Sequence, residues 1–184
     1  MSIYTVVSKF STNSNATAYF CYLDSPVGSI LAAADDKHLY IVAFEDTKNF
    51  AKKFEALASE LKCKFVEQKN KILLKFEQEL SDYFDGKLKK FTTPLKFLGS
   101  DFQKAVWEKL VEIPYGTTQT YGDLAKSMGR PASHSRAVGA ACKANPLFLI
   151  VPCHRLVASH SIGGYNSGVD RKDKLIQHEN KSSC

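Results

Sequence analysis

The sequence predicts an α+β fold in two parts, a small N-terminal α/β domain followed by a mainly helical C-terminal domain. Residues 17–86 alternate β-prone runs with two helical patterns. Residues 87–99 are rich in Lys and Thr and show no period, which predicts a linker. Residues 100–184 carry repeated helix-capping signals. We therefore expect a supporting domain at 17–86 and a C-terminal domain at 100–184, preceded by a flexible tail at 1–16.

The composition excludes several classes of protein. The 184 residues are 44% hydrophobic and 24% charged, unlike collagen-like, mucin-like or wholly disordered chains. No apolar run approaches the about 20 residues that span a bilayer, so we expect no membrane partner. The five cysteines are odd in number, and no two are spaced as Cys-x-x-Cys. This pattern argues against a disulfide framework and a zinc ribbon, so reduced thiols are expected.

Each element of the N-terminal domain follows from a hydrophobic period bounded by turn residues. Asp24-Ser25-Pro26-Val27-Gly28 and Asp35-Asp36-Lys37 are turn signals that separate the first three β-prone runs. The predicted strands are residues 17–23, 29–34, 39–44 and 63–66. Apolar side chains at helical spacing predict two helices, and Gly86 is a stop signal for the second. The predicted helices are residues 49–61 and 70–84.

Capping residues define the predicted helices of the C-terminal domain. Ser100 and Gln103 form a capping-box pattern before the first helix. Thr120 with Asp123 resembles a second N-terminal signal, which begins a short helix. Ser133 is expected to cap the helix that follows.

The last two of these helices have the proportions of a helix-turn-helix, because a tight Gly/Pro turn joins residues 121–128 to residues 134–144. The second helix is rich in small side chains, namely Ala137, Gly139, Ala140, Ala141 and Ala144. Residues 124–169 contain no Asp or Glu and five Lys or Arg, so an anionic polymer meets no like-charge repulsion there. Many helical hairpins bind nothing, and a basic face can simply be solvated. These features alone therefore leave nucleic-acid binding open.

A pair of reactive side chains follows a short apolar run. Residues 147–151 predict a buried strand, and Cys153 and His154 come directly after it. A thiolate is a nucleophile, and the imidazole can take the thiol proton through a water. A carboxylate could orient the imidazole, and Glu179 is one of only three acids after Asp123. It ends a predicted helix at residues 170–179. A buried inert cysteine and a metal ligand are the alternatives.

The residues around this pair carry a longer ordered pattern. Its segments are Phe102-Gln103, Val106-Trp107, Ile113-Pro114-Tyr115-Gly116, Tyr121, Arg136-Ala137-Val138-Gly139, Asn145-Pro146, Val151-Pro152-Cys153-His154-Arg155, Gly164-Tyr165 and His178-Glu179. With these ordered flanks, the chain resembles the methylated-DNA–protein-cysteine methyltransferases, also called O6-alkylguanine-DNA alkyltransferases. The resemblance is dense over residues 102–179 and thinner before them, where Asp24-Ser25-Pro26-Val27-Gly28 is the main match.

The resemblance implies a fold, a reaction and a partner. The N-terminal domain is expected to be ribonuclease H-like, and the C-terminal domain to carry a winged helix-turn-helix. The family flips O6-alkylguanine, and also O4-alkylthymine, out of duplex DNA and moves the alkyl group irreversibly to a cysteine. We therefore expect a stoichiometric methyltransferase that needs no metal and no cofactor. Its expected partner is double-stranded DNA, bound through the minor groove by a monomer, with clustering along DNA left open.

By match to the family, Cys153 is the alkyl acceptor. His154 acts as a base through a water, and Glu179 orients it. Asn145 matches a hinge that ties the recognition helix to the active-site segment. Each of these roles is carried over from the resemblance alone.

Further residues match positions around the flipped base. Tyr121 and Lys172 correspond to groups that protonate or stabilise the departing guanine, although Lys172 could instead face solvent beside Arg171. Tyr165 matches a pocket wall, and the backbone around Asn166 should meet the O6 edge. The remaining residues expected at the DNA are Arg136, which fills the vacated place in the base stack, and Lys143, Ala137, Gly139 and Arg155.

The sequence departs from the family pattern in several places. The loop at residues 158–163 is one residue shorter than usual, and Ser167 stands where Gly is frequent. Both changes line the expected pocket and bear on the size of alkyl group it takes. Some relatives carry zinc in the first domain, but Cys21, His38 and Cys63 do not match those ligand positions. No structural zinc is expected.

Two other functions compete with repair. Alkyltransferase-like proteins keep the fold and bind the lesion but lack the cysteine, and the presence of Cys153 argues against this class. A cysteine hydrolase could use Cys153 and His154, but the helix-turn-helix pattern argues against it. The expected compartment is the cytoplasm in a prokaryote and the nucleus in a eukaryote.

Overall fold

The computed structural model describes residues 16–47 and 50–181. It divides into two compact units, Met1–Leu98 and Gly99–Cys184. The tail predicted at residues 1–16 lies, except for Ala16, outside the described residues, as do Asn49 and Cys184. Among the described residues, no helix has both the length and the apolar character that a membrane span requires.

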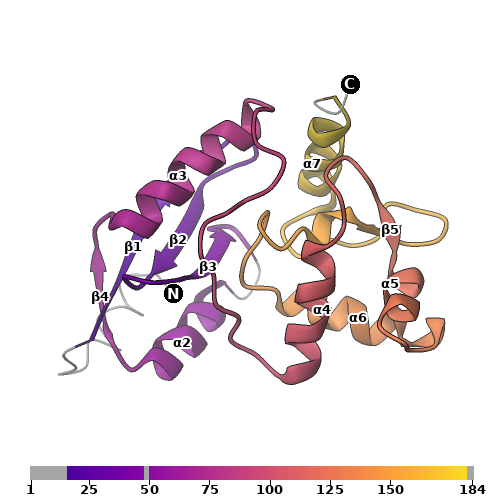
Figure 1. Cartoon of the computed structure of the whole chain (residues 1–184), viewed down its shortest axis with the longest axis horizontal. Helices are drawn as coiled ribbons and strands as arrows, with labels where there is room; N and C mark the ends of the chain where they lie inside the picture. Colours follow the sequence, from indigo (N-terminus) through magenta and orange to yellow (C-terminus); the bar gives the residue numbers. More distant parts are fainter. Residues whose placement is uncertain (1–15, 48–49, 182–184) are drawn as a thin grey trace. The chain divides into compact units, whose positions relative to one another are not determined.

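The first unit is built on a four-stranded sheet with the order β3-β2-β1-β4 (Figure 1). Its strands are β1 (Thr17–Leu23), β2 (Ile30–Ala34), β3 (Leu39–Phe44) and β4 (Lys64–Glu67). β2 runs antiparallel to both of its neighbours, whereas β4 runs parallel to β1. The bounds of the four predicted strands are confirmed to within one residue.

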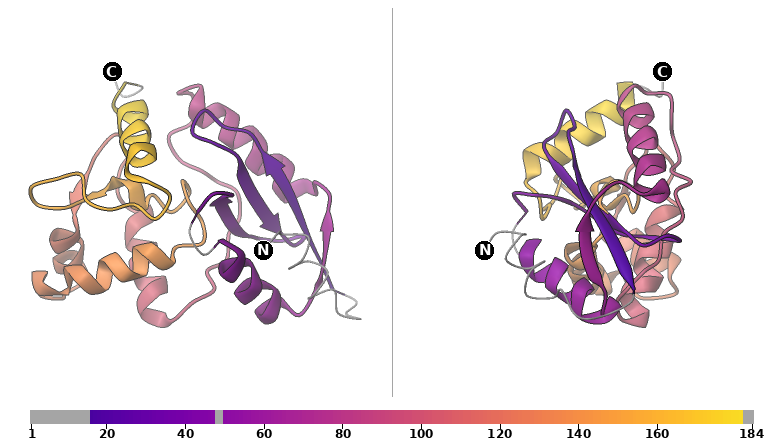
Figure 2. Two further views of the ribbon diagram at one scale, coloured as in Figure 1. Left: turned by 180° about the vertical axis from the view of Figure 1, so that it is seen from behind. Right: turned by 90° about the vertical axis from the view of Figure 1, so that its left-hand side faces the viewer.

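Two helices cover this sheet. They are α2 (Phe50–Leu61) and α3 (Lys71–Phe84). Every residue of β2 and β3 is buried, which requires cover on both faces. Figures 1 and 2 show α2 and α3 on opposite sides of the twisted sheet. Phe54 and Leu57 of α2 join a core cluster with alternate sheet residues such as Phe20.

The segment predicted as a linker is fixed to this first unit at two places. The buried Glu79 carboxylate of α3 accepts hydrogen bonds from the backbone N–H and hydroxyl groups of both Thr92 and Thr93, at 2.5–3.1 Å. The chain then pairs with the start of β3, where Leu39 N–H donates to the Pro94 carbonyl at 2.8 Å. The first unit ends only at Leu98 because these contacts hold the segment down.

The second unit is mainly helical. It contains α4 (Asp101–Val111), β5 (Gln119–Thr120), α5 (Tyr121–Ser127), η1 (Ala132–His134), α6 (Ser135–Ala144), η2 (Cys153–Arg155), β6 (Leu156–Val157) and α7 (Val169–Lys181). The indole N–H of Trp107 in α4 donates to the Ala141 carbonyl in α6 at 3.0 Å, which ties these two helices together in the core. β5 and β6 form a short parallel pair.

Two of the three predicted helix N-caps of the second unit are present in the structure. The capping box of Ser100 and Gln103 is present in full, and Thr120 accepts a hydrogen bond from the Asp123 N–H, so both predictions are confirmed. The prediction that Ser133 caps the next helix is wrong. The chain forms the short 3₁₀ turn η1 there instead, and α6 begins after His134 with no side-chain cap.

Candidate active site

The apolar run before Cys153 is a buried turn, and the predicted strand at residues 147–151 is wrong. The Val151 N–H donates to the Leu147 carbonyl at 2.9 Å, and Leu149 has a φ of 70°. The side chains are buried as expected. A short apolar run indicates burial without deciding between a strand and a compact turn.

Asn145 holds this turn closed and connects it to the cysteine. Its Oδ1 accepts from the Leu147 N–H at 2.9 Å, and its Nδ2 donates to the Val151 carbonyl at 2.9 Å and to the Cys153 Sγ at 3.3 Å. An amide side chain has one acceptor and a two-donor group, which suits this combination of partners. Because Asn145 directly follows α6 and is fully buried, it fixes the end of that helix to Cys153.

A buried ion network lies beside the cysteine. His154 Nε2 lies 2.7 Å from Glu179 Oε1. The Arg155 guanidinium donates through Nε to Oε2 at 2.9 Å and through a terminal nitrogen to Oε1 at 3.0 Å. Its other terminal nitrogen donates to the Ile113 carbonyl at 2.6 Å, and the Gly116 N–H donates to Glu179 at 3.1 Å. The Glu179 carboxylate on α7 therefore forms hydrogen bonds with three different residues.

This network sets the protonation of its members. Burial lowers the pKa of His154, against the pull of the Glu179 carboxylate, so the imidazole is neutral near pH 7. Burial also favours the neutral acid at Glu179, but hydrogen bonds from His154 and Arg155 hold the pKa of that carboxyl well below its usual range. The neutral imidazole then carries its proton on Nε2, facing Glu179. Its Nδ1 has no hydrogen-bond partner among the described residues and can accept a proton.

Lys172 and Tyr121 lie next to each other. Lys172 is fully buried, and its Nζ donates to the carbonyls of Leu156 and Gly164 and lies 5.7 Å from the centre of the Tyr121 ring. This placement excludes the alternative that Lys172 faces solvent. Burial lowers the pKa of Lys172. Burial is the main cause that raises the pKa of Tyr121 to about 12, so its hydroxyl keeps its proton.

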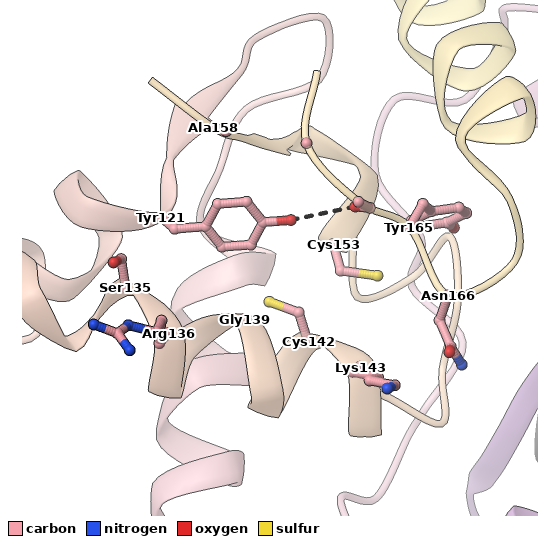
Figure 3. A pocket seen from close by; sticks show the side chains of 12 residues that line it. Tyr121, Ser135, Arg136, Gly139, Cys142, Lys143, Cys153, Ala158, Tyr165 and Asn166 are labelled. Atoms are coloured by element: carbon pink, nitrogen blue, oxygen red, sulfur yellow. Dashed lines mark hydrogen bonds between the residues drawn. The ribbon is translucent and has the colours of Figure 1, made fainter. Parts of the chain in front are cut away.

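Cys153 and Tyr121 line a cavity of about 520 Å³ (Figure 3), whereas Asn145, His154, Lys172 and Glu179 are not among the residues that line it. Residues predicted for the site that line it are Cys153, Tyr121, Arg136, Gly139, Lys143, Tyr165 and Asn166. Figure 3 shows the cavity between α6 and the segments that carry Cys153 and Tyr165. At Gly163, with φ +73°, an added Cβ would lie 3.1 Å from the Ala158 nitrogen, so glycine keeps this wall close.

Comparison with known proteins identifies the family. The model of the 6-O-methylguanine DNA methyltransferase ribonuclease-like domain matches residues 18–97, and that of the DNA binding domain matches residues 101–181. A methylated-DNA–protein-cysteine methyltransferase of Methanosarcina acetivorans is 43% identical over 167 residues, which are 90% of this chain and 99% of that protein. The chain belongs to the methylated-DNA–protein-cysteine methyltransferase family.

Solved structures agree with this assignment. The OGT of Mycobacterium tuberculosis, solved in complex with DNA, has a TM-score of 0.76 and 31% identity, over 89% of this chain and 94% of that one. The O6-methylguanine-DNA methyltransferase of Pyrococcus kodakaraensis has a TM-score of 0.65 and 28% identity, over 88% of this chain and 98% of that one. The predicted fold class, a ribonuclease-like domain followed by a helical DNA-binding domain, is confirmed.

The structure corrects one assignment within this methyltransferase. Arg155 was expected at the DNA, but its guanidinium is buried and its three nitrogens are bonded to Glu179 and to the Ile113 carbonyl. It is therefore buried against Glu179 and serves to hold that carboxylate. Ala137 lies on α6 outside the cavity lining.

Sequence reasoning also missed part of the cavity. The lining residues that it did not place there are Ser135, Cys142 and Gly164. The loop at residues 158–163 was expected to line the pocket, and its end residues Ala158 and Gly163 do so, whereas Ser167, the other departure, is not among the lining residues. Cys142 gave no signal beyond its place on a helix of small residues.

Proposed function

We propose that this methyltransferase repairs DNA by direct damage reversal, transferring the alkyl group of O6-alkylguanine or O4-alkylthymine to Cys153. The observation that carries the proposal is the position of the Cys153 thiol. It opens into a cavity and accepts a hydrogen bond from Asn145, and the next residue is the buried His154, paired with Glu179. Methyl transfer to a cysteine is the activity for which the relatives are named.

The proton of the thiol has an acceptor in this site. Neutral His154 takes it at Nδ1 through a water, while Glu179 keeps the Nε2–H oriented. The Asn145 amide, which donates to the sulfur, stabilises the thiolate that remains. No metal or cofactor is needed for these steps.

The thiolate then displaces the damaged base. Its sulfur attacks the alkyl carbon in line as the bond from that carbon to O6 breaks. The departing guanine takes a proton from the Tyr121 hydroxyl, and Lys172 beneath the ring supports the transfer electrostatically. The product is a thioether, which has no hydrolysable bond. Each chain therefore acts once.

The base reaches Cys153 by leaving the duplex. Extrusion of the base costs a few kcal/mol. Contacts to the backbone of the bent DNA, and a side chain inserted in the base stack, offset this cost. Exposed Arg136, at the mouth of the cavity, supplies that side chain. The small residues of α6 let its backbone approach the minor groove. We expect the protein to bind as a monomer, and a sigmoidal binding curve would reveal clustering along DNA. The expected compartment is the cytoplasm in a prokaryote and the nucleus in a eukaryote.

The deciding experiment uses duplex DNA that carries one O6-methylguanine. After incubation, peptide mass spectrometry should place one methyl group on Cys153, and the lesion should disappear in equal amount. Cys153→Ala should bind the duplex but leave the lesion intact, and Cys63→Ala, changed in the first unit, should behave as the wild type. Tight binding without an adduct would instead support an alkyltransferase-like lesion-binding protein.

A further inference from the structure

A second cysteine faces the cavity, and the proposed reaction does not use it. Cys142 lies on α6, is 7% exposed and lines the same cavity as Cys153, which is 5% exposed. Neither is in a disulfide. Figure 3 shows the two side chains on facing parts of the cavity wall, one on α6 and one at the start of η2, with their sulfur atoms turned in different directions.

Asn145 contacts both cysteines and fixes their relative position. Its backbone N–H donates to the Cys142 carbonyl at 3.1 Å, and its side-chain Nδ2 lies 3.3 Å from the Cys153 sulfur. Asn145 therefore links the backbone of Cys142 to the sulfur of Cys153 and holds both cysteines at this end of α6.

The two thiols differ in reactivity. Burial, and then the charge of the Cys153 thiolate, raises the pKa of Cys142 far above its usual range, so it stays protonated. Cys153 has in addition the Asn145 donor at its sulfur. A protonated thiol does not compete for the alkyl group, but it remains available to a neighbouring sulfur that has been oxidised.

We propose that Cys142 and Cys153 form an oxidisable dithiol that closes into a disulfide and reversibly blocks the alkyl acceptor. A hydroperoxide oxidises the Cys153 thiolate, as its O–O bond breaks, to a sulfenic acid, with release of water or an alcohol. The Cys142 sulfur attacks the Cys153 sulfur, the S–O bond breaks, and the oxygen leaves as water with the Cys142 proton. The two thiols lose two electrons in total to the peroxide, and a thiol reductant reverses the step by exchange.

The device would protect the acceptor from permanent loss. A sulfenic acid without a partner thiol proceeds to sulfinic acid, which thiols do not reduce. Cys142 would trap the first oxidised form instead. Only the expected effect on activity rests on the proposed role of Cys153, because the disulfide itself is detected by mass.

The test treats the purified full chain with graded hydrogen peroxide, removes the excess, and maps peptides without reduction. The expected species links the Cys142 and Cys153 peptides and has lost two hydrogen atoms. Alkyl transfer to an O6-methylguanine duplex should fall with this species and return nearly completely after dithiothreitol. For Cys142→Ser, each activity is divided by that of the same variant without peroxide. In this variant the loss of alkyl transfer should persist after dithiothreitol, and Cys153 should carry sulfinic acid. Cys63→Ser is the matched control and should recover like the wild type.

Three results would overturn the inference: no linked peptide in the wild type, a link to another cysteine, or full recovery of Cys142→Ser. Peptide mapping of the wild type needs no variant, so poor folding of Cys142→Ser does not weaken the test. If the disulfide forms but the untreated protein never transfers an alkyl group, the proposed function fails and the dithiol stands.

Discussion

Glu179 is the centre of a buried ion network, because its single carboxylate faces His154, Arg155 and the Gly116 N–H. It also fixes which nitrogen of His154 bears the proton. Sequence reasoning chose Glu179 from three candidate acids, but it placed Arg155 at the DNA when the guanidinium is a buried partner of that same carboxylate. A buried charge is stable only when it is paired, so these residues depend on one another.

Glu179→Gln should therefore destabilise the protein strongly. It leaves the buried Arg155 charge without a counter-charge, at a cost of about 3–5 kcal/mol in the free energy of unfolding. Urea unfolding at pH 7 measures this, with Glu108→Gln on the exposed face of α4 as the control, for which about 0.5 kcal/mol or less is expected. Equal stability of the two variants would contradict the network.

The stability of the wild type should fall as the solution is acidified. The pKa of His154 lies below its ordinary value of 6.5 and the pKa of Glu179 below its ordinary value of 4.5, so the unfolded chain binds more protons than the folded one. The sign of the linkage then requires loss of stability from about pH 6.5 downward, and further loss below about pH 4.5. Unfolding free energies between pH 8 and pH 3 test this, and a flat or rising profile toward acid would refute it.

Asn145 should be needed for both stability and reaction rate. Asn145→Ala leaves the buried Leu147 N–H and Val151 carbonyl unpaired, which costs about 1–3 kcal/mol for each group. Asn145→Asp keeps an acceptor for Leu147 but loses the donor to Cys153. Both variants should react more slowly with free O6-benzylguanine, a substrate that makes no contact with a DNA duplex. An unchanged rate in Asn145→Asp would show that the amide does not act on the sulfur.

Helix α6 shows the tension between stability and function at the scale of an element. It begins without a side-chain cap and contains Gly139 in its interior, and both features weaken a helix. Gly139 lines the cavity, and an added Cβ there would meet only Tyr121 Cε1, at 4.0 Å. The fold therefore has room for a larger residue at position 139. We infer that glycine is present because a side chain would take up space in the cavity and on the DNA-facing surface.

Gly139→Ala should accordingly separate stability from activity. We expect the free energy of unfolding to rise by about 0.5–1 kcal/mol, because alanine is the better helix former. Alkyl transfer from duplex DNA should slow, since the new methyl group narrows the cavity. Thermal unfolding and single-turnover rates are the two measurements, and Gly122→Ala in α5, where an added Cβ meets Ala132 Cβ at 3.6 Å, is the control helix glycine. A faster or unchanged transfer rate would remove the steric argument.

At the scale of the whole molecule, charge is distributed unevenly along the chain. The net charge is +6, and residues 124–169 contain no acid. Burial of Arg155 removes one cation from the surface that this stretch presents. Since Arg136 is assigned to the base stack, exposed Lys143 and Arg130 are the main candidates for phosphate contacts. Lys126 is partly neutralised by Asp123, 3.1 Å away.

Binding to duplex DNA should therefore weaken as salt rises. Each phosphate contact contributes about 0.9 to the slope of log affinity against log salt, so Arg130→Ala and Lys143→Ala should each reduce the slope by about one contact. Lys52→Ala, an exposed change on α2 of the first unit, should leave the slope unchanged. Fluorescence anisotropy over a range of NaCl concentrations measures it. A complex insensitive to salt would contradict a basic binding surface.

Features that depend on a few neighbouring residues can be predicted from local sequence. The strands and helices of the first unit, the caps at Ser100 and Thr120 and the delivery of Cys153 and His154 after a buried run all rest on local hydrophobic period or local hydrogen bonding. The resemblance to the family rests on the same order of local segments.

Only the tertiary structure decided which charged and reactive side chains are enclosed. Arg155 bonds to a carbonyl 42 positions away, and Lys172 to one 16 positions away, and in sequence both look like ordinary surface cations. Cys142 joins Cys153 at one cavity because Asn145 ties the end of α6 to a compact turn in place of the expected strand. Burial depends on what the rest of the chain packs against a residue, and no local pattern records that.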